Sequence, residues 1–345
     1  MSNSRESLTT TEQPSQTLKC APPLISAALR RIEEVAKVSP QVGWDRPVMQ
    51  ELRDLYPLLP QLGDWLKTEA SVGTPGPVNE FLKQQGIPLS LDNMGRDDDI
   101  YSAAVLKVLA EWAQKGKQAR LRLANGQEVP AVSMVGQDSM PHHITVYNLG
   151  RASRNQLSGL EDLAVRIATK TPGVDFILVP QVFDDPYKKG RYVLSKLFEE
   201  DHSFRGLVFP MVDLKITEEA INELIGATVM GGDGKPVIIA QAKGYMLLQM
   251  NEVAARAEAA AALGATRGFS LEKKPVLVID RPFTVVLNIN GVPVMAVPVD
   301  YQNMKDPGNI GNLERGGTDP HIYSSEDMNN PSQSSYFGMG RSGWR

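Results

Sequence analysis

The sequence predicts an α+β fold, in which a helical N-terminal segment is followed by a mixed, largely antiparallel β unit with a few helices. Two patterns predict this architecture. Near the N-terminus, apolar residues recur at the helical period, and five prolines between residues 47 and 77 cut the chain into short pieces. After about residue 120, short apolar runs alternate with Gly-containing turns, which is typical of strands joined by hairpins.

Residues 21–119 form the segment that we expect to be mainly helical. A first helix is predicted by apolar residues on one face, namely Leu24, Ala28, Ile32 and Val35. A second helix is predicted between Ile100 and Trp112, because apolar residues recur there and the acidic residues 97–99 suit a helix N-terminus.

Residues 120–302 are expected to form the α+β core. Asn125-Gly126 lies between apolar residues and predicts a hairpin with a type I′ turn. Two further strand pairs are expected, one turning at residues 231–234 and one at Asn290-Gly291. This part of the chain should therefore contain much antiparallel pairing.

Two more strands and two helices are expected in the same core. The strands are 144–147 and 174–179. The second strand is apolar except for Asp175, which indicates that most of it is covered on both faces. One helix is predicted over 157–167 with Ser153 as its cap, and a shorter one is capped by Thr217 and ends before Gly226.

The two ends of the chain have a different composition. Residues 1–20 are rich in Ser, Thr and Gln and are predicted to be a disordered arm. Residues 303–345 are rich in Gly, Asn and Ser and show no sustained period, so we expect a flexible tail.

Charge and cysteine content exclude several classes of protein. The chain has 36 Lys and Arg against 40 Asp and Glu, which argues against binding nucleic acid through its phosphates. Cys20 is the single cysteine, so an internal disulfide and cysteine-rich metal sites are excluded. The polar N-terminus lacks a signal sequence and no apolar stretch could span a bilayer, so we expect a soluble protein, cytoplasmic or otherwise intracellular.

Sequence motifs for catalysis or cofactor binding are weak. Residues 338–343 have the spacing of a dinucleotide loop, but they lie too close to the chain end for a following helix. Residues 232–235 are explained by a hairpin turn, and His142-His143 has no further metal ligands nearby in the sequence. We therefore predict no catalytic residue, no metal and no cofactor, and expect that the protein is not an enzyme.

An alanine-rich segment, residues 251–268, lies between strand patterns and allows two interpretations. Helix propensity and the Glu252/Arg256 spacing favour a helix over 252–263. As an extended strand, the segment would have one wholly small face, made by Ala255, Ala257, Ala259 and Ala261. Its charges, Arg256 and Glu258, would lie on the other face. A strand of this kind could enter an already packed sheet at little steric or desolvation cost.

Over roughly residues 174–300 the sequence resembles the serpins. Asn251-Glu252 and the small residues after it resemble the hinge at the start of the serpin reactive-centre loop. Asp280-Arg281-Pro282-Phe283, with the apolar runs that follow to residue 298, is similar to the C-terminal strand pair of the family. Residues 176–180 and 209–216 resemble two core strands in the right order.

The resemblance implies an inhibitor of a trypsin-like protease, which acts through an exposed loop over residues 251–274. The scissile bond would follow Gly268 or Arg267, and residues 254–267 would then insert into a sheet as a new strand. The loop residues implied are Glu252, Ala255, Ala257, Ala259, Ala261, Arg267 and Gly268.

A second interpretation remains open: a non-catalytic structural or assembly protein, with a helix over 252–263 and mobile termini that dock onto partners. Both interpretations expect a protein partner, either a protease or an assembly partner, and neither predicts an oligomeric state.

Overall fold

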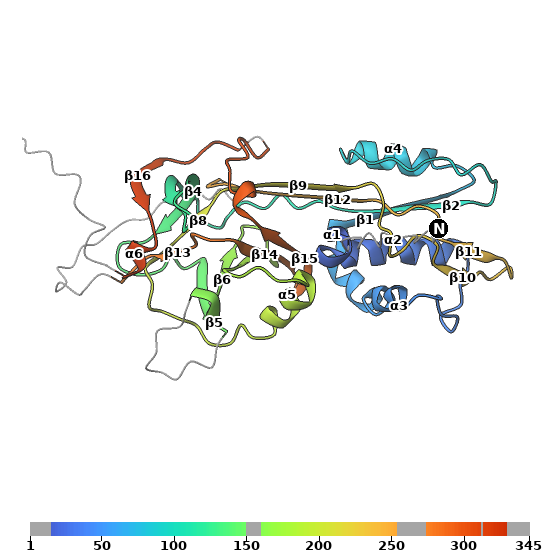
Figure 1. Ribbon diagram of the computed structural model, residues 1–345, viewed down its shortest axis with the longest axis horizontal. Helices are drawn as coiled ribbons and strands as arrows, with labels where there is room; N and C mark the ends of the chain where they lie inside the picture. The colour runs from blue at the N-terminus through green and yellow to red at the C-terminus, as the bar shows by residue number, and fades with distance from the viewer. Residues whose placement is uncertain (1–14, 150–159, 254–273, 312, 330–345) are drawn as a thin grey trace, which may run out of the picture. The chain divides into compact units, whose positions relative to one another are not determined.

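The computed structural model describes residues 15–149, 160–253, 274–311 and 313–329. It confirms a mixed α+β fold with largely antiparallel sheets (Figure 1). The chain divides into two compact units. The first contains the residues up to Tyr56, with Thr68–Ala103 and Ile216–Tyr245; the second contains Pro57–Lys67, Ala104–Lys215 and the residues from Met246 onward.

The first unit is mainly helical. Its helices are α1 (Gln16–Cys20), α2 (Pro22–Val35), α3 (Pro47–Arg53) and α4 (Gly76–Gln84), and its hairpin consists of β10 (Thr228–Met230) and β11 (Pro236–Ile238). Helix α2 confirms the first predicted helix. Leu29 of α2, Met49 and Leu52 of α3, and the chain around Ile221 and Leu224 form the core of this unit.

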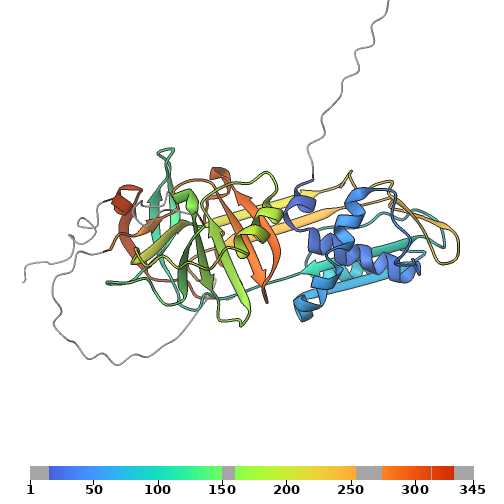
Figure 2. The same cartoon turned by 90° about the horizontal axis from the view of Figure 1, so that it is seen from below.

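The second unit contains two five-stranded sheets. The first has the order β13-β8-β4-β3-β16, made by Leu277–Val278, Gly206–Pro210, Glu128–Val135, Lys117–Arg122 and Thr318–Tyr323. The second has the order β15-β14-β7-β6-β5, made by Val292–Val299, Phe283–Ile289, Val174–Val179, Leu163–Ala168 and Ile144–Asn148. Figure 2 shows the strands of the second sheet side by side.

Helical turns of the second unit lie between and after these strands. They are α5 (Pro186–Leu194), α6 (Glu326–Asn329) and the 3₁₀ turns η1 (Tyr56–Trp65, which begins in the first unit), η2 (Leu160–Asp162) and η3 (Tyr301–Asn303). Helix α5 packs on β14 and β15 at Gly190, where a Cβ would lie 3.2 Å from both Val286 and Ala296. The absence of a side chain at Gly190 therefore lets the helix lie close to the sheet.

Several predicted strands of the second unit are confirmed. Strand β7 is buried along its whole length, as expected for a strand covered on both faces. Strands β5, β14 and β15 match the predicted strand at 144–147 and the pair that turns at Asn290-Gly291. Asn290 and Gly291 both have positive φ, 51° and 85°, which is the geometry of a type I′ turn.

Four further strands form two pairs, and each of them has residues in both units. β1 (Leu66–Val72) pairs with β2 (Ile100–Leu106), and β9 (Val212–Glu218) pairs with β12 (Gly244–Met250). In β12 buried residues alternate with more exposed ones, so one face of the strand is covered.

The predicted helix between Ile100 and Trp112 is wrong. Residues 100–106 form β2, in which Tyr101, Ala103 and Val105 are buried and the residues between them are partly exposed. The apolar residues of this stretch fit a period of two as well as a helical period, and strand pairing with β1 decides between them.

The two helices predicted in the core are also wrong. The apolar residues of 157–167 that the structure describes lie in η2 and β6, which is paired on both sides; Ser153 and Leu157 lie outside the described residues. Thr217 belongs to β9, and no helix follows it up to Gly226. The carboxylate of Glu218, expected in the first turn of that helix, instead accepts hydrogen bonds from the backbone N–H groups of Gln16 and Thr17 in α1.

The turn at Asn125-Gly126 differs from the predicted type. The hairpin β3–β4 exists, but Asn125 does not have positive φ. The N–H of Leu123 donates to the carbonyl of Gln127 at 2.8 Å, so the loop has three residues and Gly126 alone takes the left-handed conformation.

Both chain ends contain more regular structure than expected. Helix α1 occupies the last five residues of the predicted disordered arm, and the hydroxyl of Ser15 caps it. Strand β16 lies within the predicted flexible tail and pairs with β3 in parallel, so that prediction is wrong for residues 318–323. Tertiary partners, which composition does not reveal, order these two segments.

Candidate functional site

The candidate site is the pair of chain segments that flank residues 254–273, and both belong to the second unit. The first segment, residues 251–253, follows β12 directly. Its three side chains are buried. The second segment, residues 274–280, contains β13 and leads to β14.

Asn251 is held by hydrogen bonds of its backbone and its side chain. Its carbonyl accepts from the indole N–H of Trp112 at 2.9 Å, and its side-chain amide donates to the carbonyl of Gly308 at 2.9 Å. Its side-chain oxygen accepts from the N–H of Val253 at 2.9 Å. Trp112 is itself buried edge-on against Phe176 and Phe209, so this contact joins the start of the segment to a packed core.

Glu252 lies in a cluster that also contains Gln118, Asp306, Arg315 and Gly316, called here the Glu252 cluster. Arg315 binds both carboxylate oxygens of Glu252, with Nε–Oε1 at 2.6 Å and Nη2–Oε2 at 3.0 Å. The side-chain amide of Gln118 and the N–H of Gly316 also donate to Oε1, at 2.9 and 3.0 Å. The fully buried carboxylate of Glu252 is thus paired with the positive charge of Arg315 and accepts hydrogen bonds on both oxygens.

Arg315 connects the Glu252 cluster to the chain that follows β15. Its guanidinium also binds Asp306 at 3.1 Å and the carbonyl of Gly308 at 3.1 Å. The carbonyl of Arg315 in turn accepts from the ammonium of Lys115 at 2.8 Å. The C-terminal segment therefore holds the residue immediately after Asn251 in a fixed position.

Electrostatics in the cluster keep Glu252 ionised. Burial by itself would raise the pKa of Glu252, but the hydrogen bonds from Arg315, Gly316 and Gln118 outweigh burial and hold that pKa below its ordinary value. The hydrogen bond to Glu252 raises the pKa of Arg315 in turn. Both groups are charged at neutral pH.

The second flanking segment is fixed as well. The ammonium of Lys274 donates to the carbonyl of His202 at 2.8 Å, and the carbonyl of Pro275 accepts from the N–H of Arg205 at 3.0 Å. Leu277 and Val278 then pair in parallel with β8. The segment before residue 254 is therefore buried and hydrogen-bonded, and the segment after residue 273 is hydrogen-bonded from Lys274 and buried from Val276 onward.

Asp280, Arg281, Pro282 and Phe283 form the connection from β13 to β14. Asp280 is buried, its carboxylate contacts the guanidinium of Arg281 at 3.2 Å, and its carbonyl accepts from the N–H of Ala124 at 2.8 Å. Phe283 is fully buried at the start of β14. These residues position the strand pair.

The structure describes only some of the predicted site residues. Glu252 and residues 280–283 are described, whereas Ala255, Ala257, Ala259, Ala261, Arg267 and Gly268 lie outside the described residues. The sequence interpretation missed Trp112, Gln118 and Arg315. A buried carboxylate requires a cation, so burial of Glu252 would have predicted a Lys or Arg partner. The sequence alone does not identify which of the 36 Lys and Arg residues is that partner.

The described residues contain neither a grouping of three metal-ligating side chains nor a helix with the length and apolar character of a membrane span. His143 is buried, and neither of its ring nitrogens has a hydrogen-bond partner among these residues. Burial, together with the charge of His142, lowers its pKa to about 4, so its imidazole is neutral at pH 7.

Comparisons with known proteins give structural matches only. No protein-family model and no curated protein match the sequence. The solved structures that are similar include Serpin48 of the insect Tenebrio molitor, described as a highly specific serpin. It is 11% identical over 83% of this chain and 99% of that chain, with a TM-score of 0.43.

Two further matches are also serpins. Native protease nexin-1 with heparin is 9% identical over 82% of this chain and 99% of that chain, with a TM-score of 0.46. A serpin from Schistosoma mansoni is 12% identical over 82% and 91%, with a TM-score of 0.47. The chain is thus similar in structure to serpins. At this identity and with TM-scores below 0.5, the likeness by itself says nothing about activity.

Proposed function

We propose that the protein is a serpin-like, non-catalytic inhibitor of a trypsin-like protease, which it engages through the loop 251–274. The observation that carries this proposal is the fixation of both flanks of residues 254–273, by the Glu252 cluster on one side and by β13 on the other. Fixed flanks limit the positions that the bait residue Arg267 can take, and this lowers the entropic cost of binding a protease.

Strand β12 offers a place for the loop after cleavage. It pairs with β9, and among the described residues no second strand pairs with it, so we propose its other edge as the place where the loop pairs. Residues 254–267 follow β12 after residues 251–253. If they turn back along this edge, their small face of Ala255, Ala257, Ala259 and Ala261 is the face that a covered position would accept.

The proposed chemistry uses the protease's own mechanism. The protease serine attacks the carbonyl carbon of Arg267, the bond to Gly268 breaks, and Gly268 leaves as a new amino terminus. The ester that joins Arg267 to the serine persists if insertion of the loop deforms the protease before water attacks it. The inhibitor then stays covalently bound.

Incubation with trypsin tests the proposal. We expect a complex that survives denaturing electrophoresis, and its loss in Arg267→Ala, because trypsin requires a basic residue before the scissile bond. The matched control is Arg120→Ala, outside the loop, because the Arg120 side chain is 64% exposed; this variant should still form the complex. Cleavage after Arg267 without any covalent complex would contradict inhibition.

The structural or assembly protein remains the alternative prediction. Residues 254–263 of its expected helix lie outside the described residues. One argument for that helix is weakened, because the carboxylate of Glu252, expected to pair with Arg256, is engaged by Arg315 on both oxygens.

A further inference from the structure

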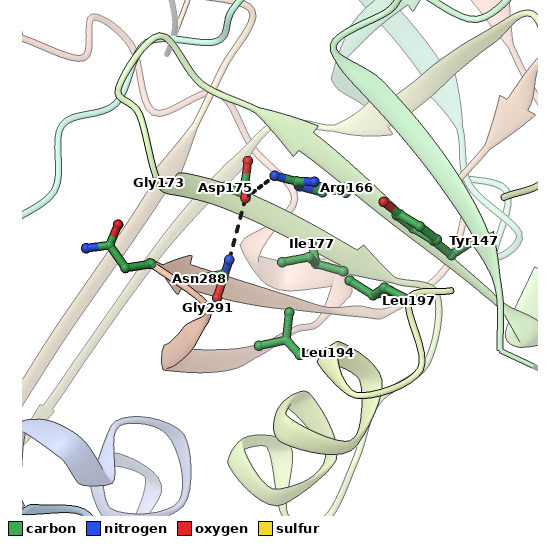
Figure 3. A pocket seen from close by; sticks show the side chains of 10 residues that line it. Tyr147, Arg166, Gly173, Asp175, Ile177, Leu194, Leu197, Asn288 and Gly291 are labelled. Atoms are coloured by element: carbon green, nitrogen blue, oxygen red, sulfur yellow. Dashed lines mark hydrogen bonds and ion pairs between the residues drawn. The ribbon is translucent and has the colours of Figure 1, made fainter. Parts of the chain in front are cut away.

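A pocket of about 330 Å³ lies on one face of the second sheet, beside the end of α5 (Figure 3). Polar side chains from three neighbouring strands line one side of it, namely Arg166 of β6, Asp175 of β7 and Asn288 of β14. Branched aliphatic side chains line another side, namely Ile177, Leu194 and Leu197. The volume and the mixed lining are those of a site for a small molecule.

Arg166 and Asp175 form the polar centre of the pocket. Nη2 of Arg166 lies 2.7 Å from Oδ2 of Asp175, and the amide nitrogen of Asn288 lies 3.5 Å from the same oxygen. The other oxygen of Asp175 has no hydrogen bond to any described residue, and Figure 3 shows it pointing away from Arg166. The pocket therefore offers an open acceptor next to the guanidinium of Arg166, which interacts with both Asp175 and Tyr147.

Stability does not explain this ion pair. Asp175 is buried on the same face of β7 as Ile177 and Val179, in a strand that is otherwise apolar. The Asp175 carboxylate is 8% exposed and loses hydration, whereas the Arg166 side chain is 44% exposed, so the ion pair contributes little to the stability of the fold. Arg166 remains charged here: burial would lower its pKa, but the hydrogen bond and charge of Asp175 outweigh burial and raise it.

We propose that this pocket binds a small zwitterion with a branched aliphatic body, the class to which the apolar α-amino acids belong. The ammonium group of the ligand donates to the open oxygen of Asp175, and its carboxylate accepts from the remaining N–H groups of Arg166. The aliphatic body packs against Ile177, Leu194 and Leu197, where it is removed from water. This site is separate from the loop 251–274 and does not depend on the proposed inhibition.

Titration calorimetry on the full chain with L-leucine tests the proposal. The matched probes are 3-methylbutylamine, which keeps only the ammonium group, and 4-methylpentanoate, which keeps only the carboxylate. We expect saturable binding of L-leucine, and a Kd at least about tenfold weaker for each probe, because each has lost one charged hydrogen-bonding group.

Variants identify the site. Arg166→Met and Leu197→Trp should each weaken L-leucine binding by about tenfold or more, the first through the carboxylate and the second by filling the pocket. The Arg166 side chain is 44% exposed and Leu197 is partly exposed, and unchanged circular dichroism spectra would verify that both variants fold. Arg120→Met, in the exposed pair with Glu128, is the control that should bind normally. No saturable binding, equal affinity for all three probes, or normal affinity in both variants would overturn the proposal.

Discussion

Glu252 is a charged side chain with no exposed surface, and Arg315 supplies the charge that makes this possible. In Arg315→Met the carboxylate would remain buried without a cation. We expect the free energy of unfolding to fall by about 3 kcal/mol, measured by urea denaturation.

The control for this change is Arg122→Met, because Arg122 also pairs with a glutamate, Glu128, but its side chain is 59% exposed. Its effect should be below about 1 kcal/mol. Equal losses in the two variants would mean that the Glu252 cluster is no more important than a surface ion pair.

His143 gives a prediction about pH. Its pKa lies near 4 in the folded protein and at the ordinary 6.5 in the unfolded chain, so between these values the unfolded state binds the extra proton. The stabilisation from neutral His143 is complete above pH 6.5 and is lost as the pH falls towards 4, by at most about 3 kcal/mol.

The replacement His143→Phe should remove this part of the pH dependence while leaving the acid titration of carboxylates in place. Urea denaturation of both proteins at several pH values from 7 to about 4 measures the difference. Parallel curves for the two proteins would show that His143 does not contribute.

Among the elements, the face of small side chains in residues 254–262 gives a prediction that distinguishes insertion of the loop into a sheet from a helix or an uninserted loop. Ala257→Arg places a long charge on the face expected to enter the sheet, so cleavage by trypsin should continue while the covalent complex disappears. Glu258→Ala changes the opposite face and should inhibit normally. Equal effects of the two changes on the yield of complex would favour a helix or an uninserted loop.

Elements with an unambiguous local pattern could be predicted from the sequence. Strand β7 is apolar at every position except Asp175, and Asn290 and Gly291 are residue types that both accept positive φ. Residues 100–106 could not be assigned in this way, because their apolar positions fit both a helix and a strand and the pairing with β1 decides.

The Glu252 cluster could not be predicted from local sequence patterns, because its residues are far apart in the sequence. Glu252 and Arg315 are 63 positions apart, and Arg315 lies in a segment whose composition predicts disorder. Such a pair becomes evident only when β16 and the chain before it are placed next to β3. The composition of a segment predicts its average tendency to be disordered, but it does not reveal a single long-range ion pair that orders the segment.

In the whole molecule, the proposed inhibition requires a native state that is not the most stable arrangement of the chain. In the proposed mechanism, cleavage after Arg267 releases residues 254–267 to pair with a strand edge such as that of β12. The cleaved protein then contains more sheet than the intact one. Its stability should therefore rise on cleavage, whereas cutting a loop leaves the stability of most proteins unchanged or lowers it.

Thermal unfolding of the intact protein and of the protein cleaved after Arg267 measures this directly. We predict that the Tm of the cleaved form is higher than that of the intact form by on the order of 10 °C or more, with both fragments still associated. An unchanged or lower Tm after complete cleavage at this bond would contradict loop insertion.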